Sequence, residues 1–346
     1  MHIRGGSSKG LYFLASDLPS DTQERDQILL SAIGRDDRQI DGLGGGDPLT
    51  SKVAIVGPSL RPDADVDFLF VQIVVGENRV DTTPNCGNIL AGVGAFALEA
   101  GLLKATHPCT LIAVNMLNSD KLCELIVETP DGNITYDGDT SIDGVPGFSA
   151  PLICNYLDLA GAVCGALFPS KHFTDTVHGT DVTCIDNGMP LVLIKASDFG
   201  LSGRVSPAEL NANDELKQRL ETLRLTLGPM MNLGDVKAKS VPKMCLISAP
   251  TQGGLINTRT FIPHVCHAAV GVLGAVSVAT ACLFKDTVTA GLVAMPQGDT
   301  VTLSVEHPSG EFSVQFHLDR SQNLPRVDKA GVVRTARLLS RGTLYI

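Results

Sequence analysis

Tryptophan is absent from this 346-residue chain, and aromatic residues make up only 5% of it. Basic residues are scarce beside acidic ones, because 27 Lys and Arg stand against 37 Asp and Glu, for a formal net charge of −10. This charge argues against nucleic acid or an anionic membrane as the main partner. It does not exclude an anionic small substrate, because a local site can be positive on an acidic protein.

Several recognisable motifs are also missing. The nine cysteines form no Cys-x-x-Cys pair and show no Cys/His spacing typical of zinc sites. The glycines at 42–46 look like a nucleotide loop, but no Gly-Lys-Ser/Thr follows, and no Gly-x-Gly-x-x-Gly opens a helix. We therefore predict that the protein needs neither a metal nor a cofactor. We expect most of the cysteines to be reduced and buried, which, with no secretory signal at the start, favours the cytoplasm.

Long apolar runs are few, and their composition predicts buried helices. Residues 268–284 hold no charge but are slightly short for a membrane span and consist mainly of small residues. Residues 89–98 have the same character. A helix that is apolar all round must be surrounded on all sides. We therefore predict a helix threaded through a curved sheet at each of these two places.

Three short patterns return at an offset of about 180 residues: Ala-Ser-Asp at 15 and 196, Cys with a later Gly-Ala at 86 and 266, and Val-Glu-x-Pro-x-Gly at 127 and 305. A period this long indicates two similar domains, and a natural active site lies in a cleft between them. With short β-branched segments elsewhere, we predict an α+β fold of two pseudo-symmetric halves. We assign residues 1–175, joined by a C-terminal strand at 332–346, to the first half and 176–331 to the second.

Four local elements are also predicted. Residues 214–227 and 23–33 have the pattern of amphipathic surface helices. Thr129–Gly132 and His307–Gly310 have proline early and glycine late between strand-like runs, which predicts two hairpin turns.

The first candidate site is the sequence Asn-Cys-Gly-Asn at Asn85, Cys86, Gly87 and Asn88. Asn85 is a good N-cap candidate for the first central helix. A cysteine in the first helical turn meets unpaired backbone N–H groups and the positive end of the helix dipole, which favour the reactive thiolate. The same N–H groups can hold a substrate carboxylate. A buried structural cysteine is the alternative.

The equivalent place in the second half reads His264-Val265-Cys266-His267-Ala268. We predict a second helix start here that binds an anion, with His264 or His267 donating hydrogen bonds and Ala268 in contact with substrate. A structural role is equally open for each histidine.

Two glycine-containing loops precede strands in the two halves. Arg4 to Gly10 combines the cations Arg4 and Lys9 with the hydroxyls of Ser7 and Ser8. Such a loop can bring backbone N–H groups against carboxylates, although an ordinary solvated turn is the alternative. Asn187 and Met189 lie in the matching loop of the second half and are expected to reach the same cleft.

Lys52 leads, after Thr50 and Ser51, into the apolar strand 53–56. A lysine at the mouth of a buried strand is partly desolvated, which makes a neutral amine available as a base. Most lysines that begin strands are merely exposed, so the position alone is weak support. We place Ser51 beside it as a substrate contact.

These motifs together resemble the PrpF family: Arg4–Gly10, Thr50–Lys52, Asn85–Asn88 and Asp186–Pro190, with further matches at Gln39–Gly42, Met231–Asp235 and Arg334–Leu339. The resemblance covers nearly the whole chain and implies a cofactor-independent isomerase with a diaminopimelate epimerase-like fold. It implies that Lys52 and Cys86 flank the substrate. Cys266 follows the internal repeat, but the family pattern does not make it catalytic. One departure is that family members usually have a strand before Arg-Gly-Gly, whereas only three residues precede it here.

The activity implied by the resemblance is keto–enol tautomerisation of 4-oxalomesaconate in bacterial gallate or protocatechuate breakdown. Cis–trans or allylic isomerisation of 2-methylaconitate, aconitate or an itaconate-type acid remains the alternative, and a non-catalytic polycarboxylate-binding protein is a third. The presence of both Lys52 and Cys86 argues against the third. The expected partners are a small polycarboxylate and a second copy of the chain, with no nucleic acid and no membrane.

Overall fold

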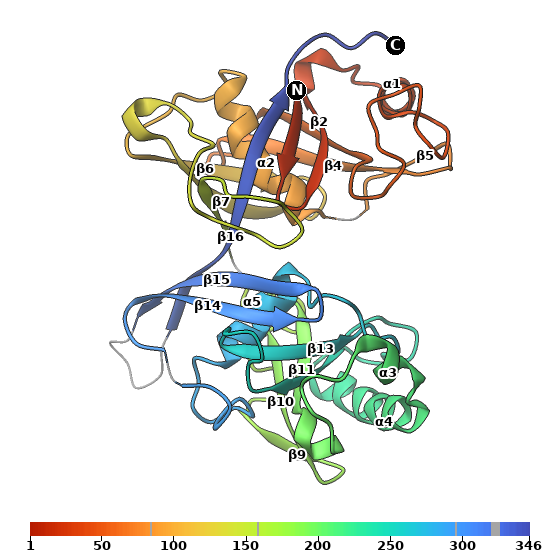
Figure 1. Ribbon diagram of the computed structural model, residues 1–346, viewed down its shortest axis with the longest axis vertical. Coiled ribbons are helices and arrows are strands. Elements are labelled where there is room, and N and C mark those ends of the chain that lie inside the picture. Colours follow the sequence, from red (N-terminus) through yellow and green to blue (C-terminus); the bar gives the residue numbers. More distant parts are fainter. Residues whose placement is uncertain (84, 158, 295, 320–325) are drawn as a thin grey trace. The chain divides into compact units, whose positions relative to one another are not determined.

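The computed structural model describes residues 1–83, 85–157, 159–294, 296–319 and 326–346. They form two compact units: Met1–Leu157 with Val333–Ile346, and Asp158–Val332 (Figure 1). The division falls before the predicted boundary at residue 175. The reason is that residues 159–167 are hydrogen-bonded to the second unit, where Gly161 N donates to Asp186 O and Asp186 N donates to Leu167 O, both at 2.8 Å.

The first unit is a closed barrel. Its strands in spatial order are β1 (His2–Gly5), β2 (Ser8–Leu14), β3 (Lys52–Pro58), β4 (Val66–Val74), β6 (Cys109–Met116), β7 (Lys121–Glu128), β8 (Pro151–Tyr156) and β16 (Arg326–Ser340). The barrel closes because the end of β16 pairs antiparallel with β1. A short strand, β5 (Arg79–Asp81), pairs with β4.

The helix α2 (Gly87–Glu99) runs through this barrel and contacts β1, β2, β3, β4, β7 and β8. Every residue from Ile89 to Ala97 is buried, so the helix presents no polar face. Its glycines permit this close packing, since a Cβ at Gly92 would lie 2.2 Å from the Tyr12 hydroxyl and one at Gly94 would lie 2.7 Å from a Val127 methyl group. The prediction of an enclosed helix of small residues is confirmed.

A second helix, α1 (Thr22–Ile33), covers the outer face of the barrel. Its N-cap residue Asp21 accepts a hydrogen bond from Glu24 N, which satisfies one of the unpaired N–H groups of the first turn. Leu29, Leu30 and Ile33 pack against strand residues that point away from α2. The predicted helix at 23–33 is confirmed.

The second unit repeats the arrangement of strands around a central helix. In spatial order its strands are the start of β16, β15 (Gly310–Asp319), β14 (Thr300–His307), β13 (Ile256–Phe261), β12 (Lys243–Ser248), β11 (Pro190–Lys195), β10 (Thr180–Asp186) and β9 (Asp175–Val177). The helix α5 (Val272–Ala281) contacts β10, β11, β14 and β15. The predicted α+β class, with strands around a central helix in each half, is confirmed.

Two surface helices, α3 (Pro207–Ala212) and α4 (Asp214–Met230), complete the second unit. The predicted stripe of leucines on α4, at Leu216, Leu220, Leu223 and Leu227, is buried as expected. In the described residues, 3₁₀ turns lie at Ala15–Asp17, Pro130–Gly132 and Ala196–Phe199. In the described part of the chain, none of the helices has both the length and the apolar character needed to cross a membrane.

Two predictions about local structure need correction. The His307–Gly310 turn is a hairpin, in which His307 pairs with Gly310, but Pro130–Gly132 is a 3₁₀ turn and β8 follows only at Pro151. The second central helix begins at Val272 after Gly271, whose φ of 78° favours glycine, and so starts well after Cys266.

Candidate active site

Lys52 begins β3 and is almost buried, with 8% of its surface exposed. It is in register with Gly10 of β2, where a Cβ would lie 2.4 Å from Lys52 O. Its side chain therefore shares the barrel face that α2 contacts. The Lys52 Nζ donates to Gln72 Oε1 at 2.6 Å and lies 5.1 Å from the centroid of the Phe70 ring. No carboxylate in the described ranges forms an ion pair with it.

Phe70, beneath the lysine, is tied to the segment that leads into α2. The Asn118 side chain accepts from Phe70 N and donates to the carbonyls of Phe70 and Thr82, each at 2.8 Å. One amide side chain therefore holds both the strand that carries the aromatic ring and the approach to Asn85 and Cys86.

Cys86 is the N-cap residue of α2, and its thiol makes no capping hydrogen bond. The prediction that Asn85 caps the helix is wrong, because the chain enters the helix one residue later and Asn85 is exposed. Gly87 is the first helical residue. By helix geometry, the N–H groups of the first turn have no intrahelical acceptor, so they point toward the end where Cys86 lies.

Asn88 joins the start of α2 to the Arg4–Gly10 loop. Its amide nitrogen lies 3.1 Å from Ser7 Oγ and 3.3 Å from Ser8 Oγ and donates to both. The loop turns at Gly6, where φ is 51° and a Cβ would lie 2.3 Å from Asn88 Oδ1. Because each serine oxygen accepts here, the hydroxyl protons are left to donate, and none donates to an atom of the described residues. The Asn88 amide therefore joins this loop to the start of α2.

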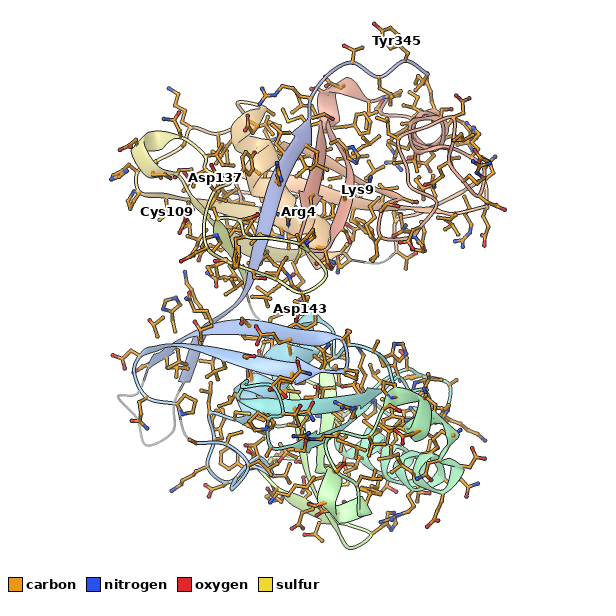
Figure 2. All side chains as sticks on the ribbon, in the orientation of Figure 1. Arg4, Lys9, Cys109, Asp137, Asp143 and Tyr345 are labelled. Carbon is orange, nitrogen blue, oxygen red and sulfur yellow. The ribbon has the colours of Figure 1, made fainter. Side chains whose placement is uncertain are left out.

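Arg4 and Lys9, both labelled in Figure 2, are directly opposed on β1 and β2. They alternate with Gly5 and Ser8, which face α2, so both cations point to the other side of the barrel wall. The Arg4 guanidinium donates to Gly6 O and Thr335 O at 3.0 Å and to Ser149 Oγ at 3.2 Å. Arg4 therefore stabilises the loop from the face of the barrel wall that points away from α2. Lys9 lies on that same face, apart from Lys52.

Ser51 is fully buried and has its own partners. Its hydroxyl lies 2.8 Å from both Gln39 Oε1 and Asp47 O. Its carbonyl accepts from Ile73 N and from the Gln72 amide nitrogen, each at 3.0 Å. These contacts fix the start of β3 and leave Ser51 a supporting position behind Lys52.

In the second unit, Asn187 and Met189 are held against α5. The Asn187 side-chain nitrogen donates to Thr280 Oγ1 at 2.8 Å, and Asn187 N donates to Ser277 Oγ at 3.1 Å. The Ser277 hydroxyl donates to Met189 O at 2.9 Å. Asn187 is 3% exposed, so its amide fixes this turn rather than reaching outward.

His264, His267 and Ala268 do not lie at a helix start, and that prediction is wrong. Cys266 pairs with Phe261 in a β-bridge, and Ile262 N donates to Val265 O, so the segment forms a tight turn before α5 begins. His264 and His267 are exposed, while Ala268 O accepts hydrogen bonds from Ser309.

Comparison with known proteins shows the family of this chain. The family model described as "PrpF protein" matches residues 1–346. The chain is 55% identical to 4-oxalomesaconate tautomerase of Pseudomonas putida over 345 residues, which cover 99% of this chain and 94% of that one. The chain belongs to the PrpF family. It is also 51% identical to (4E)-oxalomesaconate Delta-isomerase of a Novosphingobium species, over 100% of this chain and 96% of the relative.

A solved structure supports the fold as well. The crystal structure of methylitaconate-delta-isomerase has a TM-score of 0.87 to this chain at 32% identity, covering 99% of this chain and 93% of that one. The architecture of barrel strands around central helices therefore agrees with a solved relative over nearly its full length.

The sequence patterns did not single out Gln72 and Asn118, and they indicated Arg334 only as part of Arg334–Leu339. Arg334 is 6% exposed on β16. Burial lowers the pKa of its guanidinium, and the nearby Cys154, Tyr156 and Cys86 oppose that shift. A buried cation therefore lies among groups that include the candidate thiol. The sequence around Arg334 carries no local signal of its burial.

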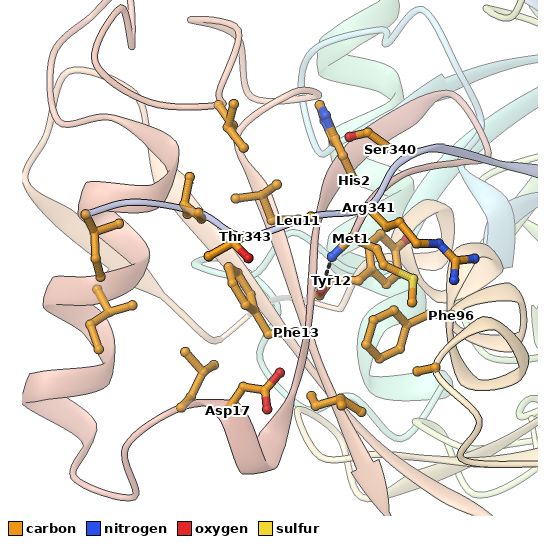
Figure 3. A pocket seen from close by; sticks show the side chains of 18 residues that line it. Met1, His2, Leu11, Tyr12, Phe13, Asp17, Phe96, Ser340, Arg341 and Thr343 are labelled. Carbon is orange, nitrogen blue, oxygen red and sulfur yellow. Dashed lines mark hydrogen bonds between the residues drawn. The ribbon is translucent and has the colours of Figure 1, made fainter.

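A pocket of about 940 Å³, shown in Figure 3, lies where β1 and β2 meet α1 and the C-terminal residues after β16. Its wall includes Met1, Tyr12, Phe96 and Arg341, and the terminal amine of Met1 donates to Tyr12 O at 2.8 Å. Neither Lys52 nor Cys86 lines it, so the candidate site is not this cavity. Among the residues that the structure describes, no group of three His, Cys, Asp or Glu side chains could hold a metal ion.

Proposed function

We propose that this protein is a 4-oxalomesaconate tautomerase, which moves a proton between the keto and enol forms of an unsaturated keto-tricarboxylate. The observation that carries the proposal is the 55% identity to the Pseudomonas putida tautomerase over 99% of the chain. The geometry of the first unit supports it, because Lys52, Cys86, Ser7, Ser8 and Asn88 belong to one connected set of strand and helix ends.

Lys52 is the base in this proposal. As a neutral amine it takes the proton from the carbon next to the keto group, and the electron pair of that C–H bond forms the new C=C bond. The carbonyl oxygen then carries the negative charge. Lys52 is 8% exposed, and no carboxylate in the described residues forms an ion pair that would have to break before it takes this proton.

The enolate oxygen needs donors that are already in place. The N–H groups of the first turn of α2 supply them, with the Ser7 and Ser8 hydroxyls. Asn88 fixes these groups relative to one another, since its amide joins the helix to the loop. Cys86 at the same helix end contacts the substrate from the other side and delivers or removes the second proton.

A second function, allylic isomerisation, follows from the same intermediate. If the proton returns to a distant carbon instead of the oxygen, the double bond moves along the chain. The 51% identity to (4E)-oxalomesaconate Delta-isomerase favours this as the alternative on the same acid. Isomerisation of a smaller acid is favoured less, because the methylitaconate isomerase shares only 32% identity.

The setting of the enzyme is also a proposal. All nine cysteines are unpaired, which favours a reducing compartment such as the cytoplasm. We place the reaction in bacterial breakdown of aromatic acids, on the basis of the family resemblance, and expect a homodimer.

Kinetics on several acids test the proposal. One preparation is assayed with 4-oxalomesaconate, 2-methylaconitate and methylitaconate, and NMR identifies each product. We expect the highest kcat/KM with 4-oxalomesaconate and an enol product. A shifted double bond would move the protein to the alternative, and faster turnover of 2-methylaconitate would reject the assigned substrate.

A further inference from the structure

Gln72 on β4 is paired with Lys52 on β3. Backbone carbonyl groups hold the nitrogen of its side-chain amide in place. The two hydrogens of the amide nitrogen are shared among three carbonyl oxygens, Pro48 O at 3.2 Å, Ser51 O at 3.0 Å and Ile73 O at 3.1 Å. A flipped amide would put its oxygen against three carbonyl oxygens, which cannot donate. The Gln72 oxygen must therefore face the lysine.

This fixed acceptor controls how the lysine presents its nitrogen. A neutral amine has two N–H bonds and one lone pair. When one N–H points at Gln72 Oε1, 2.6 Å away, the lone pair must point elsewhere. An amide oxygen also accepts from ammonium and amine alike, whereas a carboxylate would hold the proton by its charge.

We propose that Gln72 is a positioning residue for the base: it directs the lone pair of Lys52 away from the barrel wall and leaves the amine able to gain and lose a proton. The catalytic consequence rests on the proposed function. The effect on Lys52 itself does not.

The other polar groups near Lys52 in the described part of the chain do not accept a hydrogen bond from its amine. Asp81 is opposite Gln72 on β5, but its carboxylate accepts from Thr83 N at 2.9 Å and lies 4.0 Å from Arg79. On the loop before β3, the Asp47 carboxylate accepts from Leu49 N at 2.7 Å. Of the other elements packed against β3, α2 begins at Cys86, and β4 contributes the uncharged Phe70 ring. Among the described residues, Gln72 provides the hydrogen-bond acceptor that Lys52 uses.

The test compares two substitutions with opposite effects on the amine. Gln72→Glu adds a charge beside Lys52, and Gln72→Met removes the acceptor while keeping the length of the side chain. Gln23→Glu makes the same chemical change at an exposed position of α1 and is the matched control. The titration of Lys52 is followed by NMR of proteins labelled with ¹³C at lysine Cε, and the signal is assigned by its loss in Lys52→Met.

We expect the Lys52 titration midpoint to rise by roughly 1–3 pH units in Gln72→Glu. At pH 7, kcat/KM should then fall about tenfold for each unit and recover at higher pH. In Gln72→Met the midpoint should fall, because the ammonium loses its acceptor, and kcat should drop roughly tenfold or more while KM changes little. Gln23→Glu should behave as wild type.

An unchanged Lys52 titration in both Gln72 variants overturns the inference, even where activity is lower, because a purely structural residue would act that way. In Gln72→Glu a carboxylate oxygen faces three carbonyl oxygens. If that variant does not fold, Gln72→Met decides alone. If the titration moves as expected but wild type converts none of the acids, the proposed function fails and the assignment of Gln72 stands.

Discussion

The contact between β1 and the start of α2 allows a demanding prediction at Gly5. A Cβ at this position would lie 2.3 Å from Asn88 O, 3.0 Å from Gly92 N and 3.0 Å from the Tyr12 hydroxyl. Two of these atoms belong to the backbone of α2, so they cannot rotate away. Ordinary contact begins at 3.4 Å, which means that Gly5→Ala must move the helix start and β1 apart by about 1.1 Å.

Such a displacement has two measurable costs. Overpacking of a dense core costs about 1–3 kcal/mol of unfolding free energy. A shift of about 1 Å in catalytic groups can cost on the order of 10²-fold in rate. Because Cys86 and Asn88 lie on the helix that moves, we expect both losses in Gly5→Ala.

Urea denaturation and steady-state kinetics measure the two effects on one preparation. The control is Gly342→Ala, since a Cβ there has no heavy atom within 4 Å. It should match wild type in both assays. A Gly5→Ala protein with kcat within about twofold of wild type and stability within about 0.5 kcal/mol would show that the reasoning about this contact is wrong.

Three further predictions concern single groups. Lys52→Met should lower kcat on the order of 10²-fold or more with an unchanged circular dichroism spectrum, and a variant that keeps most of its kcat would remove Lys52 from the mechanism. Iodoacetamide at neutral pH should label Cys86 first and substrate should protect it, whereas the exposed Cys109 serves as an unprotected internal control in the same peptide map. Burial raises the pKa of the Glu306 carboxyl, but hydrogen bonds from residues 251–254 outweigh it and hold that pKa below its usual 4.5. The stability from this group is therefore complete above about pH 4.5 and is lost as pH falls through the lowered value, so denaturation of Glu306→Gln should depend less on acid pH, and an unchanged pH dependence would contradict this.

Composition was enough to predict the central helix that the barrel strands enclose. Runs of small apolar residues can be stable only inside other structure, and α2 lies inside a barrel as expected. Lys52 at the start of a buried strand was also predictable.

Features that depend on pairing between distant strands were not predictable. Gln72 lies in a run of apolar residues and has no local signal, and only the β3–β4 register brings it to Lys52. The start of α5 was placed too early because the internal repeat matched Cys266 to Cys86. The β-bridge from Phe261 to Cys266 keeps this segment out of the helix. Burial raises the pKa of the Cys266 thiol to about 11, which fits a structural cysteine.

Proton exchange in D2O tests the central claim most directly. The protein is treated with EDTA, incubated with 4-oxalomesaconate in D2O, and followed by ¹H NMR beside a sample without enzyme and one with Lys52→Met. We predict that wild type incorporates deuterium next to the keto group as the enol forms, while Lys52→Met matches the sample without enzyme. Equally fast exchange by Lys52→Met, or exchange that appears only after a divalent metal is added, would contradict it.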